Sequence, residues 1–209
     1  MYTYGRGVAR DDAEAVKWYR RAAEKGNENA QYRLGLMYAD GRGIAQDYAE
    51  AMKWYRRAAE QGVGWAEFNL GVMYANGRGV ARDYAEAMKW YRRAAEKDVA
   101  WAQTNLGYMY EKGQGVPQGH AEAAKWYRLA AEQGDALAQA NLGVMYAEGR
   151  GVAQDYVQAH MWSNLAAATY PPGKDREKAA SARDTLARKM TPAQVAEASR
   201  LARDFKPRK

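Results

Sequence analysis

"LGVMYANGRGV", residues 70–80, places Gly71 inside an apolar run and follows it with two more glycines. A glycine in the middle of a helix costs about 1 kcal/mol relative to alanine, so its presence needs a reason. Close copies of this stretch begin at Leu34, Leu106 and Leu142, and successive copies start 36 residues apart. A pattern that returns at a fixed period predicts a repeat protein, in which the glycine has the same structural role each time.

Two more positions of the repeat hold one residue type throughout the chain. Tryptophan occurs at Trp18, Trp54, Trp90, Trp126 and Trp162, and glycine at Gly7, Gly43, Gly79, Gly115 and Gly151. Within one repeat, Ala30, Leu34 and Met37 have the spacing of a buried helix face, and a glycine-rich loop follows them. This pattern predicts a first helix in each repeat that ends at the loop.

The segment "QDYAEAMKWYRRAAEQG", residues 46–62, predicts a second helix. Asp47 is expected to cap its start, with Glu50 completing a capping box, and Gly62 is expected to cap its end. Its apolar positions are Ala51, Trp54, Ala58 and Ala59. Each repeat is therefore expected to be a helical hairpin.

The recurring glycine of the first helix then has a role in packing. It occurs as Gly35, Gly71, Gly107 and Gly143. Without a Cβ atom, it is expected to let the backbone of the second helix approach closely, while the tryptophan of the repeat fills the space beside the crossing. One hairpin cannot bury its apolar face alone, so stacked hairpins share a core. The sequence predicts an all-α fold, a right-handed α/α superhelical solenoid of 36-residue helix-turn-helix repeats.

The repeat pattern divides the chain into two parts. Residues 1–169 form the repeat array: a half repeat at 1–27 and four repeats at about 28–63, 64–99, 100–135 and 136–169. Residues 170–209 break the pattern after two prolines and contain two further expected helices, over 175–189 and after the cap Thr191. We expect these helices to cap the last apolar face and to carry a basic tail.

Taken together, the repeat positions spell "A-x-x-x-LG-x-MY-x-x-G-x-GV-x-x-D-x-x-x-A-x-x-WY-x-x-AA-x-x-G". This pattern resembles the Sel-1-like repeat, a relative of the tetratricopeptide repeat, over residues 1–169. The resemblance implies an α/α superhelix that acts as an adaptor in protein complexes, commonly in bacteria, and it implies no reaction. The chain departs from the pattern at Asp98, which replaces a repeat-ending glycine, and at Gly119, which replaces the aspartate that caps the second helix.

The composition excludes some chemistry and membrane spans but does not determine the cellular location of the chain. The absence of cysteine among the 209 residues excludes disulfides and thiolate chemistry. No apolar run reaches the roughly 20 residues of a membrane span, and no signal peptide is visible. Met1 and Tyr2 align with Met37 and Tyr38, which suggests that an upstream half repeat or signal was removed. A cytoplasmic and a periplasmic or secreted location both stay open, and the half repeat could mediate self-association.

Residues suited to catalysis are few. Ser163, Ser181 and Ser199 have no lysine three positions later, and His120 and His160 stand at different positions of their repeats. The "GRG" loop lacks the later glycine and lysine of phosphate-binding loops. The sequence therefore predicts no enzyme, no cofactor and no metal, with a hydrolase as the least favoured function.

In tetratricopeptide-like solenoids, the first helices line the concave surface. The resemblance therefore places a partner on the side of these helices that faces away from the core. We call this set of positions the first-helix stripe. The residues expected to contact a protein or peptide partner are Tyr32, Leu36, Trp65, Phe68, Val72, Asn76, Trp101, Thr104, Tyr108 and Lys112. The stripe also includes Asn29, Asp40, Leu137, Ala140, Val144 and Glu148.

Two features of this surface allow a second interpretation. Trp65 and Trp101 are the only tryptophans outside the tryptophan positions of the second helix, which is typical of a binding hot spot. They could equally fill space between neighbouring repeats. Asparagine recurs at Asn69, Asn105 and Asn141, where it could hold the backbone of a bound peptide or, as we favour, satisfy a structural hydrogen bond.

The net charge of +7 suggests an alternative function. Most of the excess lies in residues 173–209, and the repeat array is nearly neutral. A basic tail could bind nucleic acid or an anionic membrane. Its residues are Arg200, Arg203, Lys206, Arg208 and Lys209. Because the tail is short and no basic stripe accompanies it, a protein partner is the better prediction.

Overall fold

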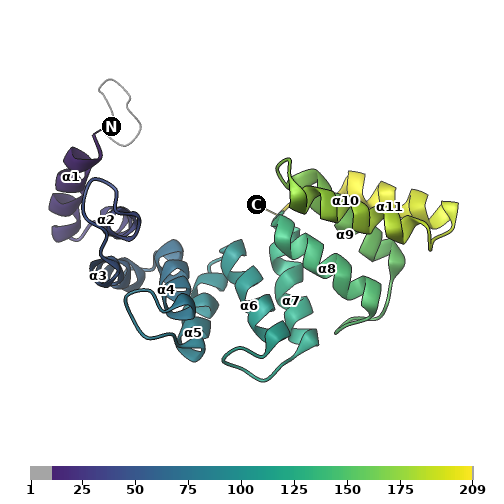
Figure 1. The fold of residues 1–209 in the computed structure, drawn as a ribbon, viewed down its shortest axis with the longest axis horizontal. Coiled ribbons are helices and arrows are strands. Elements are labelled where there is room, and N and C mark those ends of the chain that lie inside the picture. The colour runs from purple at the N-terminus through teal and green to yellow at the C-terminus, as the bar shows by residue number, and fades with distance from the viewer. Residues whose placement is uncertain (1–10, 209) are drawn as a thin grey trace. The chain divides into compact units, whose positions relative to one another are not determined.

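The computed structural model describes residues 11–208, and all regular structure in this part of the chain is helical (Figure 1). The expected repeat positions at Met1, Tyr2 and Gly7, and the tail residue Lys209, lie outside the described residues. The helices are α1 (Asp12–Glu24), α2 (Glu28–Asp40), α3 (Tyr48–Glu60), α4 (Gly64–Asn76), α5 (Tyr84–Ala95), α6 (Ala100–Lys112), α7 (His120–Glu132), α8 (Ala136–Glu148), α9 (Tyr156–Thr169), α10 (Lys174–Ala187) and α11 (Pro192–Asp204). The prediction of an all-α chain of helical hairpins is confirmed.

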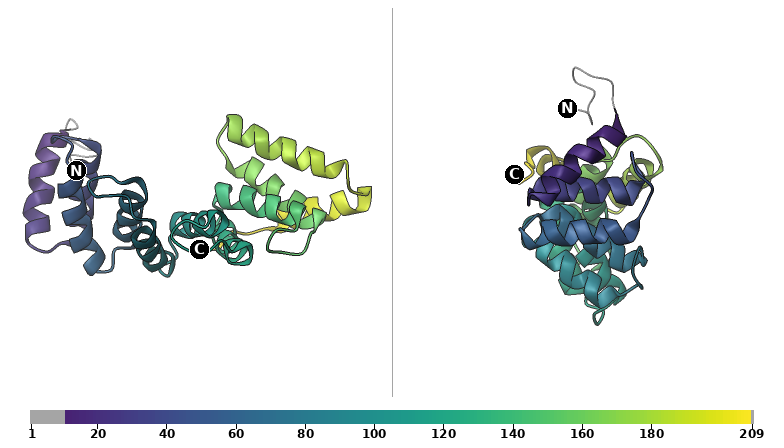
Figure 2. Two further views of the ribbon diagram at one scale, coloured as in Figure 1. Left: turned by 60° about the horizontal axis from the view of Figure 1, so that its bottom comes forward. Right: turned by 90° about the vertical axis from the view of Figure 1, so that its left-hand side faces the viewer.

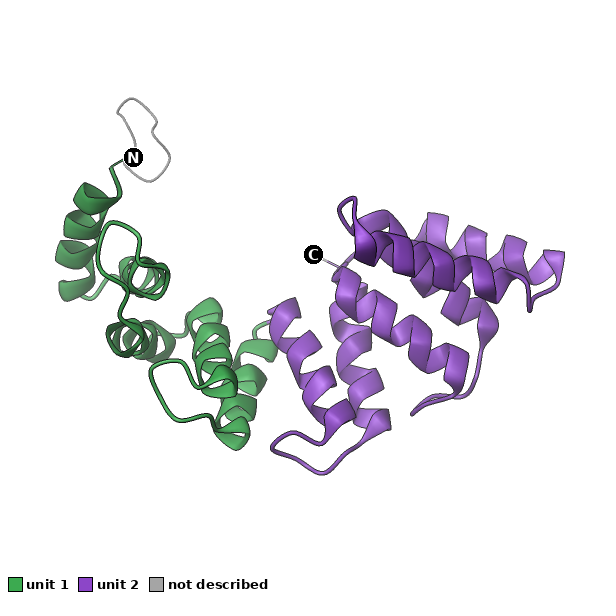
Figure 3. Cartoon of the chain, in the orientation of Figure 1, with its two compact units in different colours: residues 1–97 green, residues 98–209 purple. Residues whose placement is uncertain are grey.

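The chain consists of two compact units, residues 1–97 and residues 98–209 (Figure 3). In the first unit, each of the helices α1 to α5 packs on the next one along the chain, and Figure 2 shows α1 and α2 side by side. In the second unit, α6 to α9 pack in the same way, and α9 also contacts α10 and α11. Within each unit, every helix thus packs on its neighbours in the sequence, as expected of stacked repeats.

Helix starts follow the local sequence closely. The carboxylate of Asp47 accepts a hydrogen bond of 2.9 Å from the backbone N–H of Glu50, and aspartates cap α1, α5 and α9 in the same way. The expected capping box at α3 is only half formed, because the side chain of Glu50 pairs with Lys53 instead. A complete capping box is present at α11, where Thr191 and Gln194 bond reciprocally.

Asp98 and Gly119, the two departures from the repeat, have local consequences. After α3, Gly62 adopts a φ of +90°, and its N–H donates to the carbonyl of Ala59. Asp98 takes the equivalent place after α5 with a φ of +58°, a region that aspartate tolerates better than most residues. Gly119 starts α7 in an extended conformation without a side-chain cap. The turns therefore form in spite of both substitutions.

The recurring glycine of the first helix packs against tyrosine, which corrects our expectation of a close backbone approach. A Cβ atom added to Gly71 would lie 2.5 Å from Cδ1 of Tyr91. Three repeats share this arrangement, in the pairs Gly35–Tyr55, Gly71–Tyr91 and Gly107–Tyr127. Only at Gly143 does backbone come near, because the added atom would lie 3.2 Å from the carbonyl oxygen of Ala159. The glycine thus makes room for a ring of the second helix.

The apolar positions predicted for the second helix are all buried in α3 and α9, whereas the tryptophan position is half-buried in α5 and α7, as Trp90 and Trp126, and exposed in α1, as Trp18. In α3, these residues are Ala51, Trp54, Ala58 and Ala59. Trp54 packs with Leu34 and Met37 of α2, and Trp162 of α9 meets the ring of Phe205 edge-on with centroids 5.5 Å apart. Among the described helices, none combines the length and the apolar character needed to cross a membrane.

Candidate binding surface

The first-helix stripe holds most of the exposed apolar surface of the described chain. Seven large hydrophobic side chains are exposed between residues 11 and 208, and the two outside the stripe are Trp18 and Leu129. The five within the stripe are Trp65, Trp101, Tyr108, Leu137 and Val144. Exposed aromatic side chains of this size are the usual anchors of protein interfaces. The stripe therefore has the apolar character of a binding surface.

In the first unit, Trp65 of α4 is 42% exposed and rests on a buried aromatic layer. The ring of Phe68 meets Trp65 edge-on, with centroids 5.9 Å apart, and contacts Tyr91 at the same distance. Phe68 itself is only 8% exposed, which is contrary to our expectation of an exposed contact residue. Phe68 stands at a stripe position of α4, but the ring of Tyr91 on α5 packs against it. Phe68 therefore supports Trp65 from below.

Four other first-unit members of the stripe differ in exposure. Tyr32, Leu36 and Val72 are half-buried, whereas Asn76 at the end of α4 is exposed and donates to the carbonyl of Val72. Burial raises the pKa of Tyr32, and the nearby side chain of Asn69 opposes this shift. The structural role that we favour for Asn69 stays a prediction.

In the second unit, Trp101 of α6 is 55% exposed, and Tyr108 lies two turns further along the same helix. The ammonium group of Lys112 lies 5.7 Å from the ring centroid of Tyr108. Asn105 donates to the carbonyl of Trp101 over 2.8 Å, a hydrogen bond within its own helix. Trp101, Tyr108 and Lys112 thus form an exposed aromatic and basic face on α6.

Thr104 does not belong to this exposed face, although we expected it there. Its side chain is buried, and its hydroxyl lies 3.0 Å from Oδ1 of Asp135. The same oxygen of Asp135 accepts from the backbone N–H of Ala138 and so caps α8. Thr104 therefore ties α6 to the start of α8 and has a structural role.

Successive helices are joined by a column of buried polar side chains, which the sequence analysis did not predict. It consists of Gln31, Glu67, Gln103 and Gln139, one in each first helix. Gln31 donates to the carbonyl of Ala23 over 3.2 Å and accepts from Gln61 over 2.7 Å. Gln103 accepts from Gln133 in the same way. The signal was available, because three of four repeats carry glutamine at this position.

Glu67 replaces glutamine in one repeat and changes the partner residues with it. The side chain of Glu67 is fully buried, and Oε1 accepts from Arg93 over 3.0 Å and from Lys97 over 2.8 Å. Lys97 stands where the other repeats have Gln61 and Gln133. A glutamine pair has thus become a carboxylate with two cationic partners.

A second missed contact joins the second helices α1, α3 and α7 to the first helix of the next repeat. The guanidinium of Arg20 donates to the hydroxyl of Tyr38 over 2.7 Å, and Arg128 donates to Tyr146 over the same distance. Arg56 bonds to Tyr74 equivalently. In every case the two residues are 18 positions apart, so the constant spacing of the arginine and tyrosine columns could have indicated the pair.

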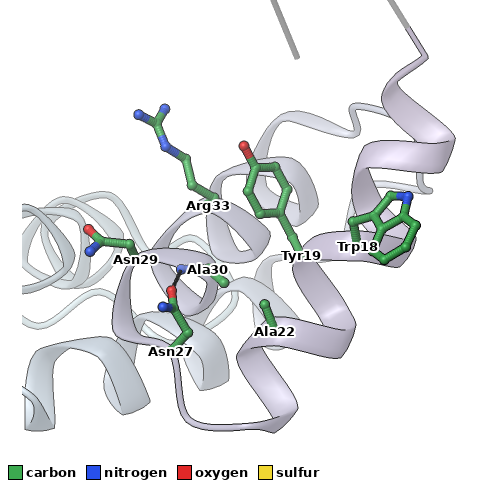
Figure 4. A pocket seen from close by; sticks show the side chains of 7 residues that line it. All are labelled: Trp18, Tyr19, Ala22, Asn27, Asn29, Ala30 and Arg33. Atoms are coloured by element: carbon green, nitrogen blue, oxygen red, sulfur yellow. Dashed lines mark hydrogen bonds between the residues drawn. The ribbon is translucent and has the colours of Figure 1, made fainter. Parts of the chain in front are cut away.

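At the N-terminal end, α1 and α2 enclose an open pocket of about 470 Å³ (Figure 4). Its lining consists of Trp18, Tyr19, Ala22, Asn27, Asn29, Ala30 and Arg33. Trp18 is 50% exposed, and the side chain of Asn27 is occupied as the cap of α2, accepting from the N–H of Ala30. The half repeat at residues 1–27, through which we expected self-association, includes α1, whereas its residues 1–10 lie outside the described part of the chain; the self-association stays a prediction.

The described residues include no group of three His, Asp or Glu side chains placed to hold a metal ion. His160 is buried on α9, at the repeat position where Met52 and Met88 stand. Burial lowers the pKa of His160, the charge of Arg183 lowers it further, and Asp184 opposes this shift. His160 therefore occupies an ordinary core position.

We expect His160→Met to reduce the loss of stability in acid. Because the folded pKa lies below the ordinary value of 6.5, the unfolded chain binds the extra proton first. The stability associated with the neutral imidazole is thus present above about pH 6.5 and is lost as the pH falls below it. Melting temperatures of both proteins between pH 8 and pH 5 test this. Parallel curves would contradict the buried-histidine explanation.

The basic tail is partly neutralised by nearby carboxylates. Arg200 pairs with Glu197 at 2.8 Å and with Asp204 at 3.3 Å. The backbone N–H of Arg208 donates to the carbonyl of Glu132 over 2.8 Å, and its guanidinium lies 3.5 Å from the carboxylate of the same residue. The tail from residue 205 to residue 208 is therefore folded against the second unit.

Comparisons with known proteins agree with this architecture. The family model described as Sel1 repeat matches residues 1–27, 29–63, 66–99, 102–135 and 136–168. A protective antigen of uropathogenic Escherichia coli with an SLR fold is 39% identical, with a TM-score of 0.86. That alignment covers 97% of this chain and 44% of the antigen, so the chain spans less than half of the antigen's length.

Two further structures show different degrees of similarity. A Sel1 repeat protein from Oxalobacter formigenes is 39% identical with a TM-score of 0.82, over 99% of this chain and 84% of its own. An immunity protein from Pseudomonas aeruginosa is 20% identical with a TM-score of 0.52, over 86% of this chain and 76% of its own, which is a likeness of fold alone. No curated protein sequence matches the chain.

Proposed function

The chain belongs to the Sel1 repeat family, and we propose from this that it is a non-enzymatic scaffold that binds a protein segment on its first-helix stripe. The observation that carries the proposal is the exposure of apolar side chains at stripe positions within each unit: Trp65 in the first unit, and Trp101, Tyr108, Leu137 and Val144 in the second. Repeat scaffolds bind through extended surfaces of this kind, because each repeat contributes the same face.

The chemistry of the stripe favours a polypeptide partner with apolar anchor residues. Indole and phenol rings supply a large contact area at little cost in side-chain entropy, since each has only two rotatable bonds. The last position of the stripe differs in charge between repeats. It is held by Asp40, Asn76, Lys112 and Glu148. Within one unit, apolar side chains next to a position of changing charge can fix the register of a bound segment.

We expect the double substitution Trp65→Ala and Trp101→Ala to abolish partner capture from the native cell while leaving the helix content unchanged. Loss of a hot-spot tryptophan typically costs 2 kcal/mol or more of binding free energy, about 30-fold in affinity for each residue. Crosslinking and pull-down with the purified full chain measure capture, and circular dichroism measures folding.

Trp18→Ala is the matched control, because Trp18 is exposed to a similar degree but lies outside the stripe. This variant should retain capture. Unfolding of the double variant would instead identify Trp65 and Trp101 as packing residues, and equal loss in Trp18→Ala would remove the special role of the stripe.

The basic tail is the weaker candidate for a binding site. Arg200 and Arg208 already pair with carboxylates, and Phe205 is anchored on Trp162. Because deletion of the tail would remove this anchor, neutralisation by Arg203→Gln and Lys206→Gln is the cleaner test. If these substitutions abolish binding to DNA or to anionic vesicles, the electrostatic function would replace the scaffold proposal.

A further inference from the structure

The last repeat lacks the tyrosine that the other repeats pack against the recurring glycine. Gly143 of α8 faces Ser163 of α9, whose Oγ would lie 2.9 Å from an added Cβ atom. In the preceding repeat, the fully buried ring of Tyr127 occupies the equivalent place beside Gly107. A serine at this position leaves the space of a phenol ring unfilled by the chain itself.

Two cavities at equivalent repeat positions show the consequence. One is bordered by α2, α3 and α4, contains Tyr55 in its wall and measures about 110 Å³. The other is bordered by α8, α9 and α10, contains Ser163 in its wall and measures about 300 Å³. Their matching wall residues are Leu36 and Val144, Ala39 and Ala147, Asp40 and Glu148, and Tyr48 and Tyr156. We call the larger one the Ser163 cavity.

We propose that the Ser163 cavity binds a tyrosine side chain of a partner polypeptide. The ring would take the place that the other repeats fill with their own tyrosine. Cavities of about 150 Å³ already bind benzene, and about 300 Å³ is at the small end of ligand pockets. The cavity therefore fits one side chain better than a cofactor.

The lining of the cavity suits a phenol in particular. Its apolar wall includes Val144, Ala147 and Leu186, which can contact the faces of a ring. Ser181 and Thr185 of α10 add hydroxyl groups, and Glu148 and Lys189 add charged groups that could bond to a phenolic oxygen. The preceding repeat already contains such a bond, because the hydroxyl of Tyr127 donates to Glu111 over 2.9 Å. A lining that combines an apolar wall with hydroxyl and charged groups therefore favours an aromatic ring that carries one hydroxyl.

The cavity is continuous with the first-helix stripe, since Val144 and Glu148 belong to both. A segment bound along α8 could thus insert a tyrosine between α8 and α10. The claim that the tyrosine belongs to a polypeptide rests on the proposed scaffold function. The claim that the cavity binds a phenol ring does not, so the two can fail separately.

NMR titration of the full chain with 4-methylphenol, the side-chain analogue of tyrosine, tests the cavity directly. We expect saturable one-to-one binding with shifts at the amides of Gly143, Ser163 and Ser181. Ser163→Tyr supplies the missing ring from within, so it should weaken binding at least tenfold and raise the melting temperature. Ser163→Ala, the matched control, leaves the cavity open and should bind like the wild type.

Failure of 4-methylphenol to saturate the wild type, or equal binding by Ser163→Tyr, would overturn the proposal. If Ser163→Tyr does not fold, Ala182→Phe fills the cavity from α10 and should weaken binding equally. Toluene should bind more weakly than 4-methylphenol if the hydroxyl is recognised, and tighter binding of toluene would contradict a tyrosine site. If the wild type binds 4-methylphenol as expected but captures no protein, the scaffold function would be contradicted and the phenol-binding cavity would not.

Discussion

Replacing Gly107 by alanine should lower the free energy of unfolding by about 2 kcal/mol, although alanine is the better helix former. The added Cβ atom would lie 2.6 Å from Cδ1 of Tyr127, far inside van der Waals contact. The ring cannot move aside freely, because it is fully buried and its hydroxyl is bonded to Glu111. Overpacking of a core costs about 1–3 kcal/mol, and for a ring held this firmly we expect the upper end, so that about 2 kcal/mol of destabilisation remains after the roughly 1 kcal/mol gained in helix propensity. Urea unfolding of the full chain measures the difference.

Gly143→Ala provides the comparison within the same unit. The nearest group is the hydroxyl of Ser163 at 2.9 Å, which can rotate away, and the carbonyl oxygen of Ala159 at 3.2 Å needs to move by only a few tenths of an ångström, so the cost should be clearly lower than that of Gly107→Ala. In the double variant Gly107→Ala and Tyr127→Ser, the two effects should not add, because the serine removes the clash. Equal destabilisation by the two single alanine substitutions would show that the tyrosine ring is not the reason for the glycine.

The glycine column illustrates what the sequence can and cannot predict. A fixed period shows that Gly71 is constrained, and the spacing of Ala51 and Trp54 shows which face of α3 is buried. The period does not identify the residue that meets the glycine, because tryptophan and tyrosine are adjacent in "WY" and both recur. The choice depends on how the two helices are rotated about their axes. The sequence analysis therefore predicted the position correctly and its partner wrongly.

Local features were predicted well, because they depend on residues three or four positions apart. The caps at Asp47 and Thr191 and the turn at Gly62 are of this kind. The resemblance to Sel1 repeats was also confirmed, since it rests on many spaced positions at once. The interpretation of residues 170–209 as a cap, and of the stripe as a partner site, stays a prediction.

Burial between helices was harder to predict. Phe68 and Thr104 have the spacing of exposed positions on their own helices, and only the crossing of neighbouring elements covers them. Gln31 and Gln103 were not singled out by the sequence analysis, although polar side chains are seldom buried. Both side chains are buried with their amide oxygens hydrogen-bonded. Gln61 donates to the oxygen of Gln31, and Gln133 donates to the oxygen of Gln103. Periodicity on one helix contains no information on such partners.

Removing both cations from Glu67 should destabilise the first unit strongly. In the variant Arg93→Ala and Lys97→Ala, the buried carboxylate loses both groups that bond to its Oε1 atom. Its Oε2 atom already has no hydrogen-bond partner within the described residues. Leaving a buried charge unpaired costs about 3–5 kcal/mol. Because the Arg93 and Lys97 side chains are 49% and 38% exposed, truncation admits water, and we expect the lower end, about 3 kcal/mol.

The variant Glu67→Gln and Lys97→Gln is the matched control, because it copies the pairs Gln31–Gln61 and Gln103–Gln133 of the other repeats. It removes the buried charge together with one cation and should restore a neutral amide pair, with a stability within about 1 kcal/mol of the wild type. Urea unfolding measures the free energy of unfolding of both double variants and of the wild type. A glutamine variant as unstable as the alanine variant would mean that this repeat depends on the charge itself, and an alanine variant as stable as the wild type would mean that Glu67 needs neither partner.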